Sequence, residues 1–416
     1  MEPRDSIDDL EMSDTEEKTK SIILLGILTL LTITGAAVLH VNQPEFILDR
    51  FVNISEFEYS LFDTTLYLSY LIVGLFTGAL SDRWKSRRVF IFVGTSGSML
   101  FYLLMTTTIS YPLLLVYRFL QGSFTVMIWQ TLMTMVLDLS GSESRGKSMG
   151  IFGAFLAIGM GLGPAVGGVI ASYGVFWPYY FACILNIVVL VATLVALKEP
   201  ALTKNRPSLA QSLSIARRRP ELVIPGLFNF IDRLHIGFIL TALPLLLSVV
   251  LGLSESLRGM ALAIFALPFI ILQYPMGKVA DRYGRYLPLI VGSLGFGSVM
   301  SVLGFVGSTS FVALLIMLIF LGIFSGVTAP ASMALIGDYV PQDDSAMGMG
   351  LFNFMGNLGI TVGPVLFGIL IITTDFVVAF FAAGLLEVVT LGICAVLVRF
   401  FSLRERRMAF SINSTS

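Results

Sequence analysis

The sequence contains little charge and few residues that could hold a metal or form a disulfide. Asp, Glu, Lys and Arg make up 13% of its 416 residues, whereas a soluble domain has about 25%. Its histidines are His40 and His235, and its two cysteines, Cys183 and Cys394, lie in apolar segments. We expect small core residues there rather than a disulfide, a thiol catalyst or a metal site. The net charge of −1 gives no indication of a nucleic-acid partner.

Apolar residues dominate the composition instead. They make up 56% of the chain, and the mean hydropathy is +0.88. Each apolar run of about 20 residues could cross a hydrocarbon core about 30 Å thick. The pattern predicts an all-α integral membrane protein in a lipid bilayer, with no soluble domain left over. The twelve predicted transmembrane helices are residues 21–44, 57–81, 88–107, 112–137, 147–172, 176–197, 222–248, 257–280, 286–308, 311–336, 346–372 and 376–400.

Basic residues are biased to one side of this predicted topology. Of the 26 Lys and Arg, 22 lie in the two termini and in the loops on the same side as the termini. Arg50 and Arg258 lie in the opposite loops, and Arg118 and Arg233 lie within predicted spans. Cytoplasmic loops of membrane proteins carry an excess of Lys and Arg. We therefore predict a multi-pass protein of the cell (plasma) membrane with both termini in the cytoplasm.

The chain contains an internal repeat with an offset of 200 residues. "MGIFGAFLAIGMGLGPAVGG" (149–168) aligns without a gap with "MGLFNFMGNLGITVGPVLFG" (349–368). Chance explains shared apolar letters, but it does not explain a coincident Gly-Pro pair and matched prolines within spans. The coinciding positions include Gly159 and Gly359, Gly163 and Gly363, Pro164 and Pro364, Gly168 and Gly368, Pro44 and Pro244, Gly122 and Gly322, and Asp138 and Asp338.

The repeat divides the chain into two pseudo-symmetric six-helix bundles, residues 21–197 and 222–402. A polar and basic cytoplasmic linker, 198–221, separates them. We expect an acidic, disordered cytoplasmic tail at 1–20 and a second cytoplasmic tail at 403–416. Two such bundles form the usual plan of a secondary transporter, with the substrate site near the membrane midplane at their interface.

Two other function classes find little support in the sequence. "GSESRGKS" (141–148) matches the P-loop pattern, but that pattern needs a preceding strand and a packed α/β unit. A membrane-embedded enzyme needs a helix-borne constellation such as H-E-x-x-H or a serine-histidine pair, and the sequence contains neither spacing. We therefore predict that the protein is not an enzyme and not a nucleotide-driven pump.

Two loops at equivalent positions carry a family signature, "GALSDRWKSRR" (78–88) and "GKVADRYGRYLP" (277–288). Together with the twelve spans and the repeat, they resemble the loop motif G-x-x-x-D-R-x-G-R-R of the major facilitator superfamily over residues 21–402. The resemblance implies the fold of that superfamily and a gate that closes the cytoplasmic side. The matching residues are Gly78, Asp82, Arg83 and Arg87 in the first copy and Gly277, Asp281, Arg282 and Arg285 in the second.

The residue types in this motif suit a gate physically. Gly78 and Gly277 would let another helix backbone approach closely. Asp82 and Asp281 would lie beside the positive N-terminal ends of neighbouring helices, which favours a carboxylate by about 0.3–1 kcal/mol. The resemblance implies that those neighbours are the eleventh and fifth spans, each from the opposite half. The alternative is that the loops carry topology signals alone.

A second signature, "RFLQG" (118–122), lies in the fourth span and resembles R-x-x-Q-G of the same superfamily. Arg118 and Gln121 share a helix face, which Thr125 continues. Arginine within a membrane is costly unless it meets protein, water or a counter-charge. We expect Arg118 to point into the bundle; the alternative is that it snorkels to the outer interface.

The seventh span holds the densest charge cluster, "FNFIDRLHIGF" (228–238). Asn229, Asp232 and His235 are spaced i, i+3, i+6 and form a polar stripe, and Arg233 lies about 100° round the helix from Asp232. A buried carboxylate and an imidazole can exchange protons as their surroundings change. We expect this cluster to couple protons to substrate movement; the alternative is a static pair between Asp232 and Arg233.

Two further acids lie within predicted spans. Asp63, in the outer part of the second span, is a candidate for the proton or substrate site, although its position leaves exposure to water open. Glu387 lies near the middle of the twelfth span, which the family fold places at the lipid-facing periphery. The sequence leaves open whether Glu387 is protonated, faces the bundle or marks an oligomer contact.

The fifth span contains "GMGLGPAVGG" (159–168), which resembles the G-x-x-x-G-P-x-x-G-G signature of drug:proton antiporters in the superfamily. Gly159 and Gly163 form a smooth face on which we expect a helix from the other half to pack. Pro164 lacks an amide donor and should bend the helix. Gly167 and Gly168 complete the match.

These motifs together predict a secondary active transporter that works by alternating access. The prediction is proton-coupled efflux, by antiport, of an amphipathic or drug-like small molecule. The alternative is uptake of a small solute by a symporter or uniporter of the same superfamily. We expect a proton gradient in place of any bound cofactor, and a monomer.

Overall fold

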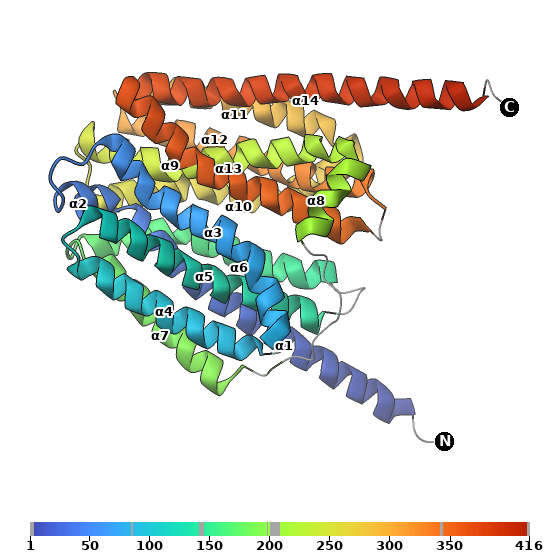
Figure 1. The fold of residues 1–416 in the computed structure, drawn as a ribbon, viewed down its shortest axis with the longest axis horizontal. Coiled ribbons are helices and arrows are strands. Elements are labelled where there is room, and N and C mark those ends of the chain that lie inside the picture. Colours follow the sequence, from blue (N-terminus) through green and yellow to red (C-terminus); the bar gives the residue numbers. More distant parts are fainter. Residues whose placement is uncertain are drawn as a thin grey trace. The chain divides into compact units, whose positions relative to one another are not determined.

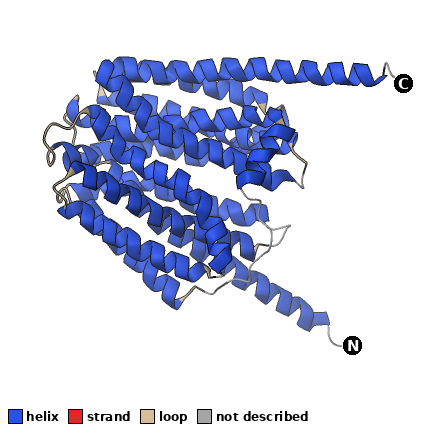
Figure 2. Ribbon diagram, in the orientation of Figure 1, coloured by secondary structure: helices blue, strands red, loops and turns tan. Residues whose placement is uncertain are grey.

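The computed structural model describes residues 4–84, 86–140, 145–197, 199, 209–341 and 344–413. Over these residues the chain is almost entirely helical and contains no strand (Figure 2). In the described part, twelve helices are long and apolar enough to cross a membrane, which confirms the predicted fold class. They are α1 (Arg4–Ala37), α3 (Glu56–Trp84), α4 (Arg87–Thr107), α5 (Tyr111–Leu139), α6 (Arg145–Ala171), α7 (Trp177–Val195), α9 (Val223–Val249), α10 (Glu255–Tyr283), α11 (Tyr286–Gly307), α12 (Phe311–Tyr339), α13 (Ser345–Thr373) and α14 (Phe376–Asn413).

The helices extend beyond the predicted spans at both ends of the chain. Helix α1 begins at Arg4 and α14 ends at Asn413, and both run on past their neighbours (Figure 1). The expected disorder of 1–20 is therefore not found from Arg4 onward. A helix nucleated by an apolar span adds further turns at little cost. Shorter helices lie between the spans: α2 (Gln43–Leu48), α8 (Leu209–Arg218) within the predicted linker, and the 3-10 turns η1 (Val38–His40) and η2 (Pro220–Leu222).

The chain forms two compact units that largely follow the two predicted halves. Unit 1 comprises residues 1–54, 65–205 and 253–263, and unit 2 comprises 55–64, 206–252 and 264–416. The difference from prediction lies at two helix starts, because the first turns of α3 belong to unit 2 and those of α10 belong to unit 1.

Equivalent helix pairs pack closely together in each unit. Helix α6 packs along α1 in unit 1, and α13 packs along α9 in unit 2. A Cβ on Gly159 would lie 3.0 Å from the Leu30 carbonyl oxygen, and a Cβ on Gly359 would lie 2.1 Å from that of Phe230. Because Leu30 and Phe230 are themselves 200 residues apart, the repeated glycines mark the same backbone contact in both units.

We predict that Gly363→Ala destabilises the protein. Its added Cβ would lie 2.2 Å from the Leu234 carbonyl oxygen of α9, so the two backbones must separate. Overpacking of this kind costs about 1–3 kcal/mol, which thermal unfolding of the purified protein in detergent would detect. The control is Gly392→Ala in α14, where the new methyl group meets no atom of the described residues within 4 Å. An equal melting temperature for the two variants would contradict the close contact.

Candidate functional site

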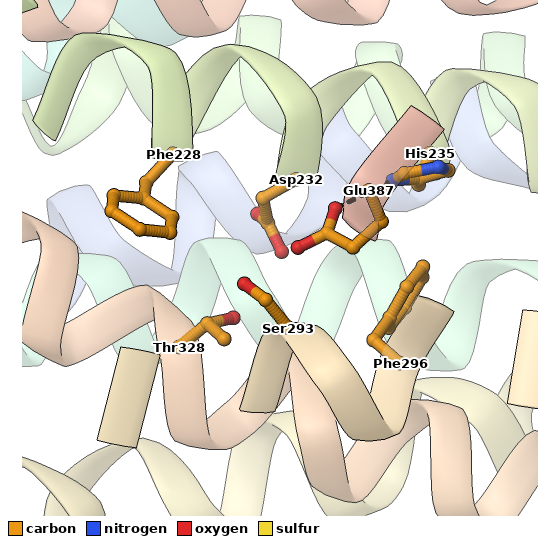
Figure 3. Close-up of a pocket in the computed structure, with 7 residues that line it drawn as sticks. All are labelled: Phe228, Asp232, His235, Ser293, Phe296, Thr328 and Glu387. Carbon is orange, nitrogen blue, oxygen red and sulfur yellow. Dashed lines mark ion pairs between the residues drawn. The ribbon is translucent and has the colours of Figure 1, made fainter. Parts of the chain in front are cut away.

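Helix α9 carries polar side chains into the interior of unit 2. Asp232 and His235 are three residues apart and project from neighbouring positions on one face. Both point into a cavity that residues of α11, α12 and α14 close (Figure 3). The lining residues are Phe228, Asp232, His235, Ser293, Phe296, Thr328 and Glu387.

His235 approaches α14 with both ring nitrogens, and Nε2 is the one that forms a hydrogen bond. Its Nε2 lies 2.8 Å from the Ala383 carbonyl oxygen of α14, and its Nδ1 lies 3.3 Å from Glu387 Oε2. The imidazole is fully buried and the Glu387 side chain is 6% exposed. The Phe296 ring packs against the imidazole, with 5.0 Å between ring centroids.

The approach of His235 Nδ1 to Glu387 does not have the geometry of a hydrogen bond, and whether it is favourable depends on the hydrogens that the two groups carry. A carbonyl oxygen only accepts hydrogen bonds, so Nε2 of His235 carries hydrogen and donates it to Ala383. If His235 is neutral, Nδ1 presents a lone pair, and a Glu387 carboxylate beside it would be repelled. The contact is favourable when either Nδ1 or the Glu387 carboxyl carries one further proton. The contact makes the pair a candidate proton-binding site.

Asp232 lies one turn before His235 and interacts with two helices. Its Oδ1 accepts a 2.8 Å hydrogen bond from Ser325 Oγ of α12. Its Oδ2 is 3.9 Å from Arg233 Nε, and the Arg233 side chain remains 33% exposed. This distance is at the outer limit of an ion pair, and the static Asp232–Arg233 pair stays an alternative interpretation.

The predicted polar stripe divides between two neighbouring helices. Asn229 Nδ2 donates a 2.7 Å hydrogen bond to the Phe352 carbonyl oxygen of α13, and Asn229 does not line the cavity. The contact holds α9 against α13, next to the place where a Cβ on Gly356 would strike Asn229 Nδ2. Of the three residues in the predicted stripe, Asp232 and His235 therefore line the candidate site and Asn229 does not.

The structure resolves the position of Glu387, which the sequence left open. Its carboxyl faces His235 inside unit 2 and is shielded from the surface. The sequence also gave no reason to select the hydroxyl groups beside it, Ser293, Ser325 and Thr328. Small hydroxyl residues are common in membrane helices, and the i, i+3 spacing of Ser325 and Thr328 was the available signal.

A separate polar network lies in unit 1, around Arg118. Arg118 is fully buried, which rules out the snorkelling alternative, and its Nη1 donates a 3.0 Å hydrogen bond to Gln121 Oε1. Gln121 Nε2 donates in turn to Tyr102 Oη and Thr125 Oγ1, at 2.9 and 2.7 Å. The expected shared face of Arg118, Gln121 and Thr125 is confirmed. These residues and Asp232 belong to different units, so the predicted site consists of two networks.

Asp63 is buried, contrary to the possibility that water reaches it. Its side chain is 0% exposed, and Asp63 Oδ2 accepts a 2.8 Å hydrogen bond from Thr241 Oγ1. Both residues belong to unit 2, since the first turns of α3 pack there. A carboxylate can be kept within a membrane when protein donors replace its water.

The glycines of the fifth-span motif pack mainly within their own half. A Cβ on Gly163 would lie 2.5 Å from Ala37 Cβ, and a Cβ on Gly167 would lie 2.4 Å from the Val38 carbonyl oxygen. The expectation that Gly159 and Gly163 face a helix of the other half is therefore wrong, because α1 occupies that face. Gly168 does meet the second half, since its Cβ would lie 2.5 Å from the Glu255 carbonyl oxygen of α10.

The first turn of α10 is tied to this motif in unit 1. A Cβ on Gly259 would lie 2.4 Å from the Pro164 carbonyl oxygen. Next to it, Arg258 is 1% exposed and forms a bidentate ion pair with Glu45 of α2, at 2.9 and 2.6 Å. The sequence pattern places Arg258 in an outer loop and gives no sign of this pair, because no local pattern links residues so far apart in the chain.

The first gating motif is described only in part. The surroundings of Gly78 and the side chains of Asp82 and Arg83 lie outside the described part of the chain. Arg87 is fully buried, with Nη2 3.3 Å from Asp138 Oδ2, so it acts within unit 1 as a buried partner of α5.

The second gating motif repeats this pairing. Arg285 Nε donates to Asp338 Oδ2 at 3.2 Å and Arg285 Nη1 donates to Asp281. The hydrogen bond with Asp281 raises the pKa of the Arg285 guanidinium. Arg282 stacks on Tyr283, with 5.4 Å between its Cζ and the ring centroid. The predicted close helix approach at Gly277 is not found among the described residues, where a Cβ would meet Pro330 Cβ at 3.9 Å.

The repeated helix pairs and the paired loop arginines agree with a comparison against known families. The profile described as Major Facilitator Superfamily matches residues 25–231 and 226–415. The chain belongs to the major facilitator superfamily. As a member of that superfamily, it is a multi-pass membrane transporter that binds small molecules, not an enzyme.

Relatives of this superfamily member include named resistance proteins. An uncharacterized MFS-type transporter of Methanocaldococcus jannaschii is 24% identical over 84% of this chain and 91% of its own length. Multidrug resistance protein 2 of Bacillus subtilis is 24% identical over 93% of this chain and 97% of its own. The class B tetracycline resistance protein of Escherichia coli is 23% identical, over 73% and 76%.

Solved structures share the fold. The nucleoside transporter NupG matches with a TM-score of 0.74 and 12% identity, covering 91% of this chain and 99% of that one. A D-xylose–proton symporter matches with a TM-score of 0.72 and 18% identity, covering 90% and 97%. At these identities the likeness shows the superfamily fold alone.

We predict that Arg258→Met lowers the stability of the protein because it leaves Glu45 without its bidentate partner. Breaking a buried ion pair costs about 3 kcal/mol, and the partial exposure of Glu45, 26%, should reduce that cost. Thermal unfolding with and without the compensating change Glu45→Gln provides the measurement. Recovery of stability in the double variant is expected. As a control, Glu255→Gln should have a smaller effect, since Glu255 lies 3.7 Å from Arg258; an equal loss in both single variants would contradict the assignment.

Proposed function

We propose that the protein is a secondary active transporter that exports an amphipathic or drug-like small molecule in exchange for protons. Two kinds of observation support the proposal. Relatives that cover most of the chain are named for multidrug and tetracycline resistance, and unit 2 contains a buried group that can bind a proton.

The contact between His235 and Glu387 carries the proposal. The Ala383 carbonyl fixes the hydrogen on Nε2, so the 3.3 Å approach of Nδ1 to Glu387 is favourable when the pair holds a proton. Loss of that proton would leave a lone pair facing a carboxylate. In a low-dielectric interior such repulsion is large enough to favour a change of conformation, and this links proton release to movement of α9 against α14.

Alternating access requires the contacts of one conformation to be broken in another. We propose that the loop motifs stabilise the state closed to the cytoplasm, and that the tight contact of Gly168 and Gly259 with neighbouring backbone stabilises closure at the outer end. We also propose that the protein resides in the plasma membrane as a monomer with both termini in the cytoplasm. The bias of 22 of its 26 Lys and Arg to one side supports that orientation.

Uptake by symport is the second candidate function. The fold is shared with a D-xylose–proton symporter and a nucleoside transporter, so the fold is compatible with uptake as well as with export. A buried proton site serves either direction of coupling, since only the order of proton and substrate binding differs. The direction of movement under a pH gradient therefore separates the two functions.

The test is transport by the purified protein in proteoliposomes with an imposed pH gradient, using ethidium and tetracycline as probes. Antiport predicts that the probe moves opposite to the protons, and that collapse of the gradient stops accumulation. Movement in the same direction as the protons would support symport, and accumulation that ignores the gradient would remove proton coupling.

We predict that Glu387→Gln abolishes gradient-driven accumulation but retains exchange of labelled for unlabelled probe. Glutamine still fills the space beside His235, but it can no longer gain and lose the proton. Asp375→Asn is the matched control, because Asp375 precedes the same helix and caps the backbone amide of Val378 at 2.9 Å. Loss of exchange together with accumulation would instead assign Glu387 a structural role.

A further inference from the structure

The cavity in unit 2 that both Asp232 and Glu387 line has room for a small ligand. Its volume is about 10 Å³, close to the space that a single water molecule needs. The cavity is polar where α9, α11 and α14 meet, since two carboxyl groups and the Ser293 hydroxyl line it (Figure 3).

Three polar atoms at this cavity make no hydrogen bond within the described residues, and one of them, His235 Nδ1, faces Glu387. Ser293 is fully buried, and neither Ser293 Oγ nor Asp232 Oδ2 has a hydrogen-bond partner among the residues that the structure describes. In Figure 3 the Ser293 hydroxyl points toward the carboxyl group of Asp232, and the carboxyl group of Glu387 points to the same place. A buried hydroxyl without a partner is costly, so a bound ligand is expected to satisfy it.

We propose that the cavity binds one water molecule, which connects Asp232 to the His235–Glu387 pair and makes them one proton-binding centre. This inference rests on the proposed function. A buried water commonly makes about three hydrogen bonds, and Ser293 Oγ, Asp232 Oδ2 and the Glu387 carboxyl supply three partners. Ser293 is thus a positioning residue that acts on the proton through the water.

The proton transfer balances without any other reactant. The protonated Glu387 carboxyl gives its proton to the water oxygen, and the water gives one of its own protons to Asp232 Oδ2. The water molecule is restored, Asp232 becomes neutral and Glu387 becomes a carboxylate. Net charge and the number of protons in the centre are unchanged, so the transfer moves one proton from α14 to α9.

The groups that face this centre are few. Arg233 is the neighbouring cation, 3.9 Å from Asp232 Oδ2, and Cys394 lies two turns beyond Glu387 on α14. Helices α11 and α12 contribute hydroxyl groups and a phenyl ring but no titratable side chain to the cavity. The protonation of the centre is therefore set mainly by Asp232, His235 and Glu387 themselves.

A sodium ion is the competing occupant of a cavity lined by oxygen atoms. In the described part of the chain, no group of three or more His, Cys, Asp or Glu side chains is arranged to hold a metal ion. A His235 imidazole in contact with Glu387 also leaves that carboxylate less available to a cation. Water is therefore the occupant that the geometry favours, and sodium is an outcome that the test must detect.

The test compares Ser293→Ala, which keeps space for the water, with Ser293→Val, which fills it. In proteoliposomes, Ser293→Val should reduce gradient-driven accumulation of ethidium about 100-fold or more, as expected for a lost proton-transfer group, with ethidium exchange retained. Ser293→Ala should show a smaller reduction. Thr361→Val in α13 is the control, since Thr361 donates a hydrogen bond to the Asn357 carbonyl oxygen of its own helix and does not line the cavity.

The outcomes separate this inference from the proposed function. If the wild-type protein is proton-coupled but Ser293→Val is equally coupled, the water site is overturned and the function stands. If the wild-type protein is not coupled, the proposed function fails, and a high-resolution structure decides the site by showing or lacking water density between Ser293, Asp232 and Glu387. If a sodium gradient drives accumulation by the wild-type protein but not by Ser293→Val, the occupant of the cavity is sodium and the proposal of bound water is overturned. Should Ser293→Val fail to fold, unaltered coupling in Ser293→Ala together with a cavity without water density would overturn the proposal.

Discussion

The cost of placing a charged or hydrogen-bonding group in hydrocarbon constrains much of this structure. Backbone groups avoid this cost because they form hydrogen bonds within helices. Polar side chains avoid it because they bind partners inside the same unit. Arg118, Arg87 and Asp63 are all buried in this way. The pair of His235 and Glu387 differs from them, because we propose that its contact is favourable only while the pair holds a proton. We regard that dependence as the link between the stability of unit 2 and the proposed transport cycle.

A second constraint is how closely two helix backbones can approach without a hydrophobic effect to drive them together. Small residues permit the approach and gain van der Waals contact from it. The repeat uses Gly159 and Gly359 for the same contact in each unit. The two halves differ at residue 167 and its repeat counterpart, residue 367. Gly167 lies against the backbone of Val38, whereas the Phe367 ring packs edge-on against the Phe238 ring, with 5.4 Å between ring centroids. The extra glycine thus serves the first half alone.

The sequence predicted the membrane fold because apolar length and charge bias follow directly from the bilayer, and the repeat predicted the two six-helix bundles. It could not predict tertiary pairs. Asp138 and Asp338 coincided in the repeat, but only the structure shows that each pairs with a loop arginine. The role of Glu387 was likewise hidden, since the direction in which a residue of a peripheral helix points depends on packing. Helical periodicity placed Asp232 and His235 on the same face of their helix, but it could not identify the residues that this face contacts.

The most direct test of the proton shared by His235 and Glu387 is proton release on substrate binding. Purified protein in weakly buffered detergent solution would be mixed with ethidium while a pH-sensitive dye reports free protons, with Glu387→Gln and Asp375→Asn measured in parallel. The account predicts that the wild-type protein and Asp375→Asn release protons on binding and that Glu387→Gln binds ethidium without release. Equal release from Glu387→Gln, or binding by the wild-type protein without any release, would contradict it.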